Sequence, residues 1–429
     1  MYILKKNIKP YEILYYAISL TYDLVDRIVI EDELQVLKSY MKNMLPVLED
    51  SLQKAAEGLP IIGYNFGIPP EIFFCFDCIP FCFEATPYII SALLPSGVEY
   101  FYDKANAWGH PYHTCSSQKG IMGMILDGKI ELDAIITPTS PCDNAIASYQ
   151  FFSNYIEVPT IYADIPALYN NERAFEYYAE ELKRMVNSVS KIIGQEPNFD
   201  NMIKAIEFNS KAHQYLLEIH ELKKAVPCPF ESIINPIIAA ATTLMPGTYE
   251  KVAFFKEVSE IGKKRLKRHA GRPGIEKFRS IWPYMSVFYD FSLYEWMDRE
   301  MGISQLWDIF NYYFYDPIQI KNKKDIDDIF LQIASQGKNL PMNRQSLLSV
   351  DVLIDDMIWL AKEYNCDFTV IMEHLGCKQM ASISQLLREE LMNELGMPTL
   401  IIELDVGDKR VTPIESIRYQ MNEFINTLL

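Results

Sequence analysis

One cysteine lies where a helix is expected to begin, and its surroundings suit a reactive thiol. Cys115 occurs in HPYHTCSSQKGIMGMILDG. Thr114, Ser116 and Ser117 could cap that helix through their hydroxyl groups. A helix N-terminus favours negative charge, so a thiolate would be stabilised there. Cys115 is therefore a candidate metal ligand or nucleophile.

Two further cysteines, Cys142 and Cys377, occur in segments that share one order of features. The first segment runs from LDAIITPTSPCDN to VPTIYADIP, and the second from CDFTVIMEHLGCKQ to MPTLIIELD. Each predicts a strand, a cysteine, a helix, a proline and a second strand, which is a βαβ unit. Parallel sheets bind ligands at the carboxyl ends of their strands. We expect two Rossmann-like domains that each present a cysteine at a crevice.

Three thiolates from separate loops could hold a 4Fe-4S cluster and leave one iron open to an outside ligand. Zinc also accepts three protein ligands and water, but its common signatures contain C-x2-C arms that these positions lack. Buried cysteines without a metal are a third interpretation. The spacing alone leaves the cluster and the structural interpretation open.

A second cysteine group, Cys75, Cys78 and Cys82, occurs in CFDCIPFC. The spacing i, i+3, i+7 predicts one face of a helix, opened by the Pro-Pro-Glu sequence at 69–71. Apolar neighbours favour packing, although a further metal or an electron-transfer role stays open. We expect Cys228 and Cys366 to be structural.

Polar residues near the three separated cysteines could transfer protons or support the ligands, but a helix cap or a core hydrogen bond would explain them equally well. We take Ser116 and His374 as the candidate catalytic residues. The other candidates for these roles are Ser117, Asp143, His110 and His113. Lys378 and Gln379 could contact substrate or cluster sulfide, although a structural role is favoured for them.

The remaining pattern predicts an α/β protein with two Rossmann-like parallel-sheet domains, an N-terminal helical segment and a helical connector. Helical periodicity in the first segment ends at Gly58, a residue typical of helix C-termini. The expected boundaries are 1–58 for the N-terminal helices, 59–170 for the first domain, 171–274 for the connector and 275–429 for the second domain.

Two tracts have unusual composition. The basic run KKRLKRHAGRPG at 263–274 is either a solvated helix end and linker or a contact for an anionic phosphate group. The aromatic tract from IWPYMSVFYDF to IFNYYFYDP is expected to lie mostly in the core, and it could also form the wall of an apolar acyl pocket.

Composition excludes several classes of function. The 429 residues are 49% hydrophobic and carry a formal net charge of −17, so a full core is expected and nucleic acid is an unlikely partner. No phosphate-loop, dinucleotide-binding, zincin or hydrolase-elbow motif occurs. The eight cysteines and the MYILKKNIKPYEIL start predict a cytoplasmic protein with reduced thiols. The apolar stretches are too short or too interrupted to cross a membrane.

Around Cys115, Cys142 and Cys377 the sequence resembles the 2-hydroxyacyl-CoA dehydratase and benzoyl-CoA reductase family. The resemblance is to the subunits that carry the catalytic iron-sulfur cluster. The resemblance rests on IPPEIFF, CSSQKG, SPCDN, VPTIYADIP, HLGCKQ, GMPTLIIELDVGDKR and VTPIESIRYQMNEFINTLL. It extends over about 350 residues and specifies the family, not the substrate.

The resemblance implies that Cys115, Cys142 and Cys377 are the cluster ligands. It also implies a related partner subunit, or a second copy of the chain, and a separate ATP-hydrolysing iron-sulfur activator that delivers single electrons. Some relatives hold a double-cubane cluster and reduce small molecules. Cys75, Cys78 and Cys82 fall outside the common three-ligand pattern, which leaves a larger cluster open.

The chemistry of the substrate explains why a dehydratase of this kind needs an electron. In a 2-hydroxyacyl thioester the proton on carbon 3 is barely acidic, so acid-base catalysis alone is too slow. One-electron reduction to a ketyl radical lets the 2-hydroxyl leave and makes that proton acidic, and the electron then returns. In a reductase of the benzoyl-CoA or double-cubane type, the electrons stay in the product. A non-catalytic partner subunit is the third interpretation.

Overall fold

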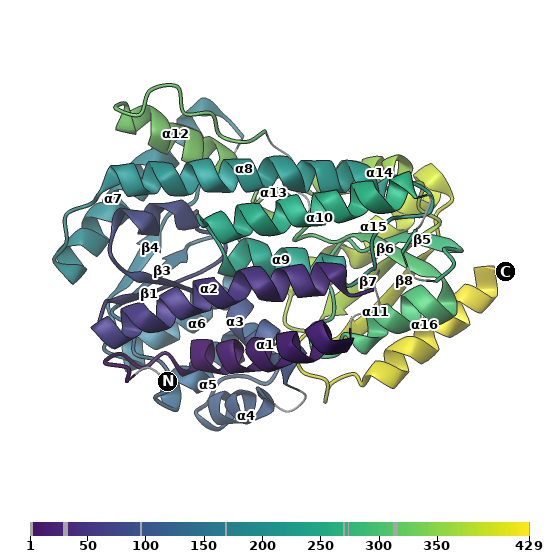
Figure 1. The fold of residues 1–429 in the computed structure, drawn as a ribbon, viewed down its shortest axis with the longest axis horizontal. Coiled ribbons are helices and arrows are strands. Elements are labelled where there is room, and N and C mark those ends of the chain that lie inside the picture. The colour runs from purple at the N-terminus through teal and green to yellow at the C-terminus, as the bar shows by residue number, and fades with distance from the viewer. Residues whose placement is uncertain are drawn as a thin grey trace.

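The computed structural model describes residues 3–28, 33–94, 97–167, 170–268, 271–272, 274–311, 316–340 and 342–428. Within these ranges two four-stranded, all-parallel sheets are surrounded by helices (Figure 1). The predicted α/β class with two Rossmann-like parallel-sheet domains is confirmed. The domain boundaries stay a prediction, although each sheet lies inside one of the expected domains.

The first sheet has the order β2-β1-β3-β4. Its strands are β1 (Ile61–Tyr64), β2 (Ile79–Cys82), β3 (Ala134–Pro138) and β4 (Thr160–Ala163). The second sheet repeats this order as β6-β5-β7-β8. Its strands are β5 (Phe278–Ile281), β6 (Ile303–Trp307), β7 (Phe368–His374) and β8 (Thr399–Leu404). In both sheets the chain changes direction beside the first strand, which is where open α/β sheets form a ligand crevice.

Helices connect the strands as the sequence pattern predicts. Both βαβ units are present, since α6 (Asp143–Tyr155) joins β3 to β4 and α15 (Lys378–Leu395) joins β7 to β8. The other helices that pack around the first sheet are α3 (Ala85–Leu93), α4 (Glu99–Ala107) and α5 (Ser116–Leu126). Those near the second sheet are α11 (Ser292–Trp296), η2 (Met297–Met301), α14 (Val350–Glu363) and α16 (Ile414–Leu428). Helix α12 (Ile326–Gly337) instead packs against α7 (Glu172–Ile193), beside the first sheet, and the short helix α13 (Asn343–Leu347) contacts α14.

The N-terminal segment and the connector are helical, as expected. The first contains α1 (Lys9–Ile28) and α2 (Gln35–Glu57), and α2 ends at Gly58 in the left-handed conformation, φ 89°. The connector contains α7 (Glu172–Ile193), α8 (Phe199–Lys223), α9 (Ile234–Leu244) and α10 (Tyr249–Lys267). Figure 1 shows α8 and α10 side by side along the molecule, beside both sheets. Among the described helices, none is long and apolar enough to span a bilayer.

The predicted helical face in CFDCIPFC is wrong. Cys75 ends a short 3-10 helix, η1 (Pro70–Cys75), whereas Cys82 ends strand β2. Pro80 lies within that strand opposite Ile62 of β1. Proline cannot donate to a ladder, but it is accepted here because β2 is the edge strand of its sheet. The cysteines therefore do not share one helical surface.

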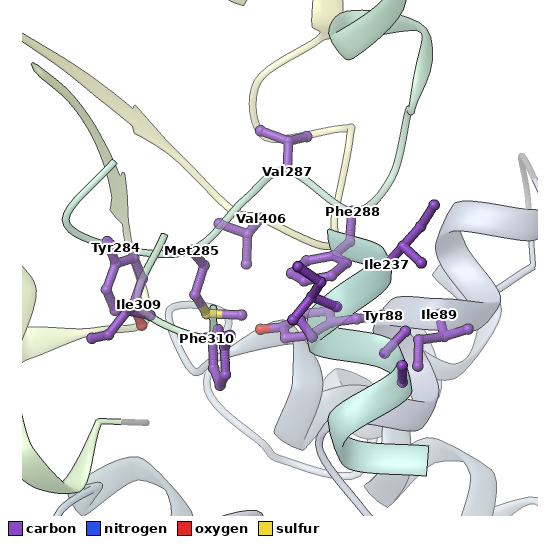
Figure 2. Close-up of a cluster of buried hydrophobic side chains, with 14 of the residues drawn as sticks. Tyr88, Ile89, Ile237, Tyr284, Met285, Val287, Phe288, Ile309, Phe310 and Val406 are labelled. Carbon is purple, nitrogen blue, oxygen red and sulfur yellow. The ribbon is translucent and has the colours of Figure 1, made fainter. Parts of the chain in front are cut away.

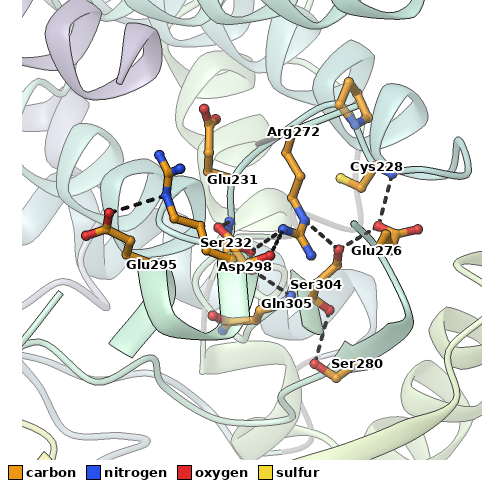
Figure 3. Close-up of polar contacts among 12 residues, drawn as sticks. Cys228, Glu231, Ser232, Arg272, Glu276, Ser280, Glu295, Asp298, Ser304 and Gln305 are labelled. Carbon is orange, nitrogen blue, oxygen red and sulfur yellow. Dashed lines mark hydrogen bonds and ion pairs between the residues drawn. The ribbon is translucent and has the colours of Figure 1, made fainter. Parts of the chain in front are cut away.

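Two of the three arginines in the basic run, Arg265 and Arg272, are structural, whereas Arg268 is exposed. Arg265 is buried and forms an ion pair with Glu231 at 2.7 Å. Arg272 is also buried, with Nη1 3.3 Å from Asp298 Oδ1 and Nε donating to Ser304 Oγ (Figure 3). For these two residues neither the solvated nor the phosphate-binding interpretation holds. Lys263, Lys264 and Lys267 are exposed, and residues 269, 270 and 273 lie outside the described ranges.

The Arg272–Asp298 pair fixes the connector to the second sheet. Ser232 donates to Asp298 through both its backbone N–H, at 2.8 Å, and its hydroxyl, at 2.6 Å. The same hydroxyl oxygen accepts from the backbone N–H of Gln305 in β6. Figure 3 shows these groups converging from three separate segments. Burying this pair is acceptable only because each charge has several polar partners.

Replacing Asp298 by asparagine leaves Arg272 as a buried cation without its carboxylate. We expect Asp298→Asn to lower the free energy of unfolding by roughly 3–5 kcal/mol. The matched control is Arg299→Ala on the next residue, whose ion pair with Glu33 is partly exposed and should contribute about 0–1 kcal/mol. Urea unfolding followed by circular dichroism measures both. Similar losses in the two variants would contradict the role of the buried pair.

Candidate functional site

The carboxyl ends of strands from both sheets surround one cavity. It contains about 780 Å³ of empty space, measured out to its open mouth. Residues from the segments after β1, β2 and β3 line one side, and residues at or after the ends of β5, β6 and β7 line the other. The lining includes Phe66, Glu84, Cys142, Asn144, Tyr284, Met285, Phe310, His374, Gly376 and Cys377. The two crevices predicted for the two domains thus form a single cavity.

Three cysteines line this cavity, and each is the N-cap residue of a helix. Cys115 precedes α5, Cys142 precedes α6 and Cys377 precedes α15. A helix N-terminus offers unpaired N–H groups and a partial positive charge, which stabilise a nearby thiolate. The structure brings together the three positions that the sequence analysis selected.

The cavity offers three sulfur donors, one from the start of each of three helices. In the parts of the chain that the structure describes, no group of three or more His, Cys, Asp or Glu side chains is arranged to hold one metal ion. A 4Fe-4S cluster makes a different demand, because each cysteine binds a different iron and the sulfur atoms need not meet at one point. Soft thiolate donors are also the ligands that such clusters use. The donor set fits the implied group.

Contacts between the two βαβ units hold the cysteine-bearing loops together. The residues after Cys142 and after Cys377 reach across to each other. The contacts are Asn144 Nδ2 to the Gly376 carbonyl, Gln379 Nε2 to the Pro141 carbonyl at 2.7 Å and Lys378 Nζ to Asp143 Oδ2 at 2.9 Å. Lys378 and Gln379 thus join the two units, and Gln379 also lines the cavity. Contact of these residues with substrate or cluster sulfide stays a prediction.

Gly376 lets the loop before α15 approach the start of α5. A Cβ added at Gly376 would lie 2.6 Å from both the backbone N and the Cα of Cys115 and 3.0 Å from His374 Nε2. Real Cβ atoms do not come so close to backbone, so a larger residue would separate Cys115 from Cys377. A glycine is required here for space, not for its backbone angles.

Cys115 has the most polar surroundings of the three cysteines. The Tyr88 hydroxyl lies 3.2 Å from its Sγ. Burial opposes ionisation of Cys115, but the neighbouring His374 outweighs it and lowers the pKa of the thiol. His374 is itself buried, yet Asp405, whose Oδ1 lies 3.9 Å from Nδ1, and Cys115 raise the pKa of the imidazole to about 9. The thiol, the imidazole and the carboxylate form a charged group inside an apolar core.

The other two cysteines have raised pKa values. Burial raises the pKa of Cys142, and the charges of Cys115 and Cys377 add to that effect. Burial also raises the pKa of Cys377, against the effect of Tyr284. Free thiolates are therefore unfavourable at both positions, whereas a bound metal would remove the penalty by neutralising the charge.

Glu84 is a cavity residue that the sequence analysis missed. Its carboxylate accepts from Asn65 Nδ2 at 2.5 Å, from Gln118 Nε2 at 3.0 Å and from the Tyr149 hydroxyl. Burial raises the pKa of Glu84, and these hydrogen bonds partly offset the rise. The only local signal was a charged residue directly after the apolar strand in FCFEAT. Its three partners come from distant parts of the chain.

Apolar and aromatic side chains form the rest of the wall. The rings of Tyr88 and Phe288 stack with centroids 5.3 Å apart and planes 6° apart (Figure 2). The aromatic tract therefore contributes to the wall of the cavity, since Tyr284, Met285, Phe288 and Phe310 line it, and its role as an acyl pocket stays a prediction. Trp282, Tyr294 and Trp307 of the same tract are fully buried core residues. Residues 312–315 lie outside the described part of the chain.

The polar residues that the sequence predicted for the site differ in whether they line the cavity. His374 lines the cavity, whereas Ser116 is fully buried outside the lining. Cys115 itself occupies the N-cap without a side-chain cap bond, so the capping predicted for its hydroxyl neighbours is wrong. Ser117 lines the cavity and donates to the Glu84 carbonyl. His110 is paired with Ser148 at 3.2 Å, and the exposed His113 is not among the lining residues.

The CFDCIPFC cysteines pack in a different place from the three at the cavity. Cys75, Cys78 and Cys82 are buried in a second hydrophobic cluster beside the first sheet. Burial raises the pKa of Cys75 and of Cys78 to about 12. Cys228 is buried as well, and Cys366 lies two residues before β7, as expected for structural residues.

Comparison with known proteins agrees with this geometry. Residues 65–428 match the family described as 2-hydroxyglutaryl-CoA dehydratase, D-component. The matched region begins just after β1 and includes every residue assigned above to the cavity. No curated protein matches the chain. Because the family match spans well over half of the sequence, the chain belongs to the 2-hydroxyglutaryl-CoA dehydratase D-component family and is a component of the 2-hydroxyacyl-CoA dehydratase type.

Proposed function

We propose that this chain is the iron-sulfur subunit of a 2-hydroxyacyl-CoA dehydratase. It eliminates water from a 2-hydroxyacyl-CoA through a ketyl radical after ATP-dependent one-electron activation. Cys115, Cys142 and Cys377 hold a 4Fe-4S cluster in this proposal. The observation that supports it is the convergence of three helix N-terminal cysteines on one largely apolar cavity.

The residues around the cysteines have roles that follow from their positions. When bound, the cluster supplies single electrons and a Lewis-acidic iron. Tyr284, Met285 and Phe288 exclude water and hold the acyl chain. Glu84 can carry a proton at a higher pH than an ordinary glutamate, because burial raises its pKa. His374 lies at the same cavity and can exchange a proton with the substrate.

The proposal includes two protein partners. One is a related dehydratase subunit, or a second copy of this chain, and the other is an ATP-hydrolysing iron-sulfur activator. The absence of a phosphate-loop motif from the sequence supports an outside source of ATP-driven electrons. The substrate partner is an acyl-CoA thioester.

A reductase of the benzoyl-CoA type could use the same three cysteines and cavity. A double-cubane cluster would need further ligands, and Cys75 and Cys78 lie in a separate core cluster. That separation favours the single cubane and the dehydratase. A non-catalytic subunit would hold a cluster whose spectrum does not change when substrate is added.

The metal content of the anaerobically purified chain tests the cluster. We expect about four irons and four acid-labile sulfides per chain. Electron paramagnetic resonance before and after dithionite should show a cluster signal that changes when a 2-hydroxyacyl-CoA is added. About eight irons would support the double-cubane reductase, and no iron after anaerobic reconstitution would contradict the proposal.

Single substitutions test the ligand set. Cys115→Ala, Cys142→Ala and Cys377→Ala should each lose most of the cluster iron, because two cysteines do not anchor a cubane well. Cys228→Ala, at a buried cysteine outside the cavity, should keep the iron of the parent protein. Iron per chain is measured colorimetrically. Full iron retention in the first three variants would exclude these cysteines as ligands.

His374→Gln tests proton transfer at the cavity. We expect the variant to keep its iron and to lose activity by about 10²- to 10⁴-fold, the usual contribution of a general acid or base. The matched control is His110→Gln, a buried histidine that pairs with Ser148 outside the lining. Rates are measured by enoyl-CoA formation with the partner subunit and the activator present. An unchanged rate in His374→Gln would remove this residue from the mechanism.

A further inference from the structure

A second cavity adjoins the cysteine cavity and has a different chemical character. It contains about 880 Å³ of empty space and shares Phe66, Ala239, Thr243 and Phe310 with the first cavity. The Phe66 and Phe310 rings meet edge to face with centroids 5.6 Å apart, so they stand in the wall between the two spaces. The second cavity also has polar lining residues, among them Glu71, Asn209, His213, Thr242 and Lys251.

Lys251 is a buried cation without a carboxylate partner. Only 8% of the residue is exposed. Its ammonium group donates to Asn209 Oδ1 at 3.1 Å and, more weakly, to the Thr242 carbonyl at 3.5 Å. Glu71 acts on it only at longer range, since the ion pairs found among the described residues do not include Lys251, and burial lowers its pKa to about 8. An ammonium group has three donors, so one remains for a ligand.

A second group in the same cavity also lacks a partner. The Thr242 hydroxyl is buried and makes no hydrogen bond with any described residue. A buried hydroxyl usually has a partner, so its absence indicates a ligand or an ordered water. Glu71 is the carboxylate of this cavity, and its Oε1 accepts from Asn209 Nδ2 at 2.7 Å. Asn209 thus separates Glu71 from Lys251 and turns its carbonyl toward the ammonium group.

We propose that the second cavity is an oxyanion-binding pocket, in which Lys251 binds a carboxylate or similar group and Thr242 donates to it. The oxyanion is either the far end of a dicarboxylic acyl group or a free small anion. The first source rests on the proposed function, because an acyl chain beside the cysteines could extend past Phe66 and Phe310 into the pocket. The pocket itself does not depend on iron or on turnover.

Titration of the purified full chain with glutarate and with inorganic phosphate tests the pocket by isothermal titration calorimetry. We expect saturable binding of at least one of them. Lys251→Met should weaken it about 10- to 100-fold, which is the value of a hydrogen bond to a charged group. Thr242→Val preserves the shape of the side chain and should weaken binding by roughly two- to tenfold. Lys256→Met, at an exposed lysine on the same helix, is the control and should bind like the parent.

A pair of thioesters distinguishes the two sources of the oxyanion. Glutaryl-CoA and pentanoyl-CoA have the same chain length and differ in one carboxylate. Tighter binding of glutaryl-CoA that disappears in Lys251→Met would assign the pocket to the acyl chain. Equal binding of both thioesters, with glutarate or phosphate still dependent on Lys251, would assign it to a free anion.

Two results would overturn the proposal. One is a parent protein that binds neither glutarate nor phosphate saturably. The other is a folded Thr242→Val and a folded Lys251→Met that both bind like the parent. Lack of iron in a chain that still binds these anions through Lys251 would count against the proposed function alone. Failure of the anion pocket can therefore be distinguished from failure of the proposed function.

Discussion

The site depends on a constraint of parallel sheets. Because the strands run in one direction, their carboxyl ends, and the loops that follow them, all lie at one edge of the sheet. Both sheets of this protein have the same strand order, and both direct that edge toward one cavity. Each parallel crossover then begins a helix at the same edge. Cys142 and Cys377 occupy those helix starts, so two helix N-termini face the cavity with their thiols. Cys115 joins them at the start of α5, within the crossover from β2 to β3.

Such a site exists only if the two sheets and their loops keep a fixed relative position. Several contacts hold them together. Gly376 permits backbone contact with Cys115, and the polar contacts after Cys142 reach the loop before α15. Farther away, Arg272 and Asp298 attach the connector to the second sheet with buried charge. Charges that are fully paired inside a protein are costly to disturb, which makes the relative position of the elements specific.

The cysteine cavity and the adjoining pocket differ in chemical character. The cysteine cavity has a largely aromatic and apolar wall, which would exclude water from the chemistry proposed there. The adjoining pocket contains a buried ammonium group and a hydroxyl without a partner. Phe66 and Phe310 lie between the two environments. In the proposed enzyme, this arrangement would separate the groups that select the substrate from the cysteines at which it reacts.

The sequence by itself determined the features that depend on local pattern. The apolar runs, the helical periodicity and the proline and glycine positions specified both βαβ units, the N-terminal helices and the placement of Cys142 and Cys377 at strand ends. Tertiary structure decided the rest. Pro80 and its neighbours form a strand because β1 offers an edge to pair with, although their spacing fits a helix. Glu84, Lys251 and Arg272 became buried charges through partners far away in the chain. Spacing describes which neighbours share a face of one element, whereas burial and charge pairing depend on elements that meet only after folding.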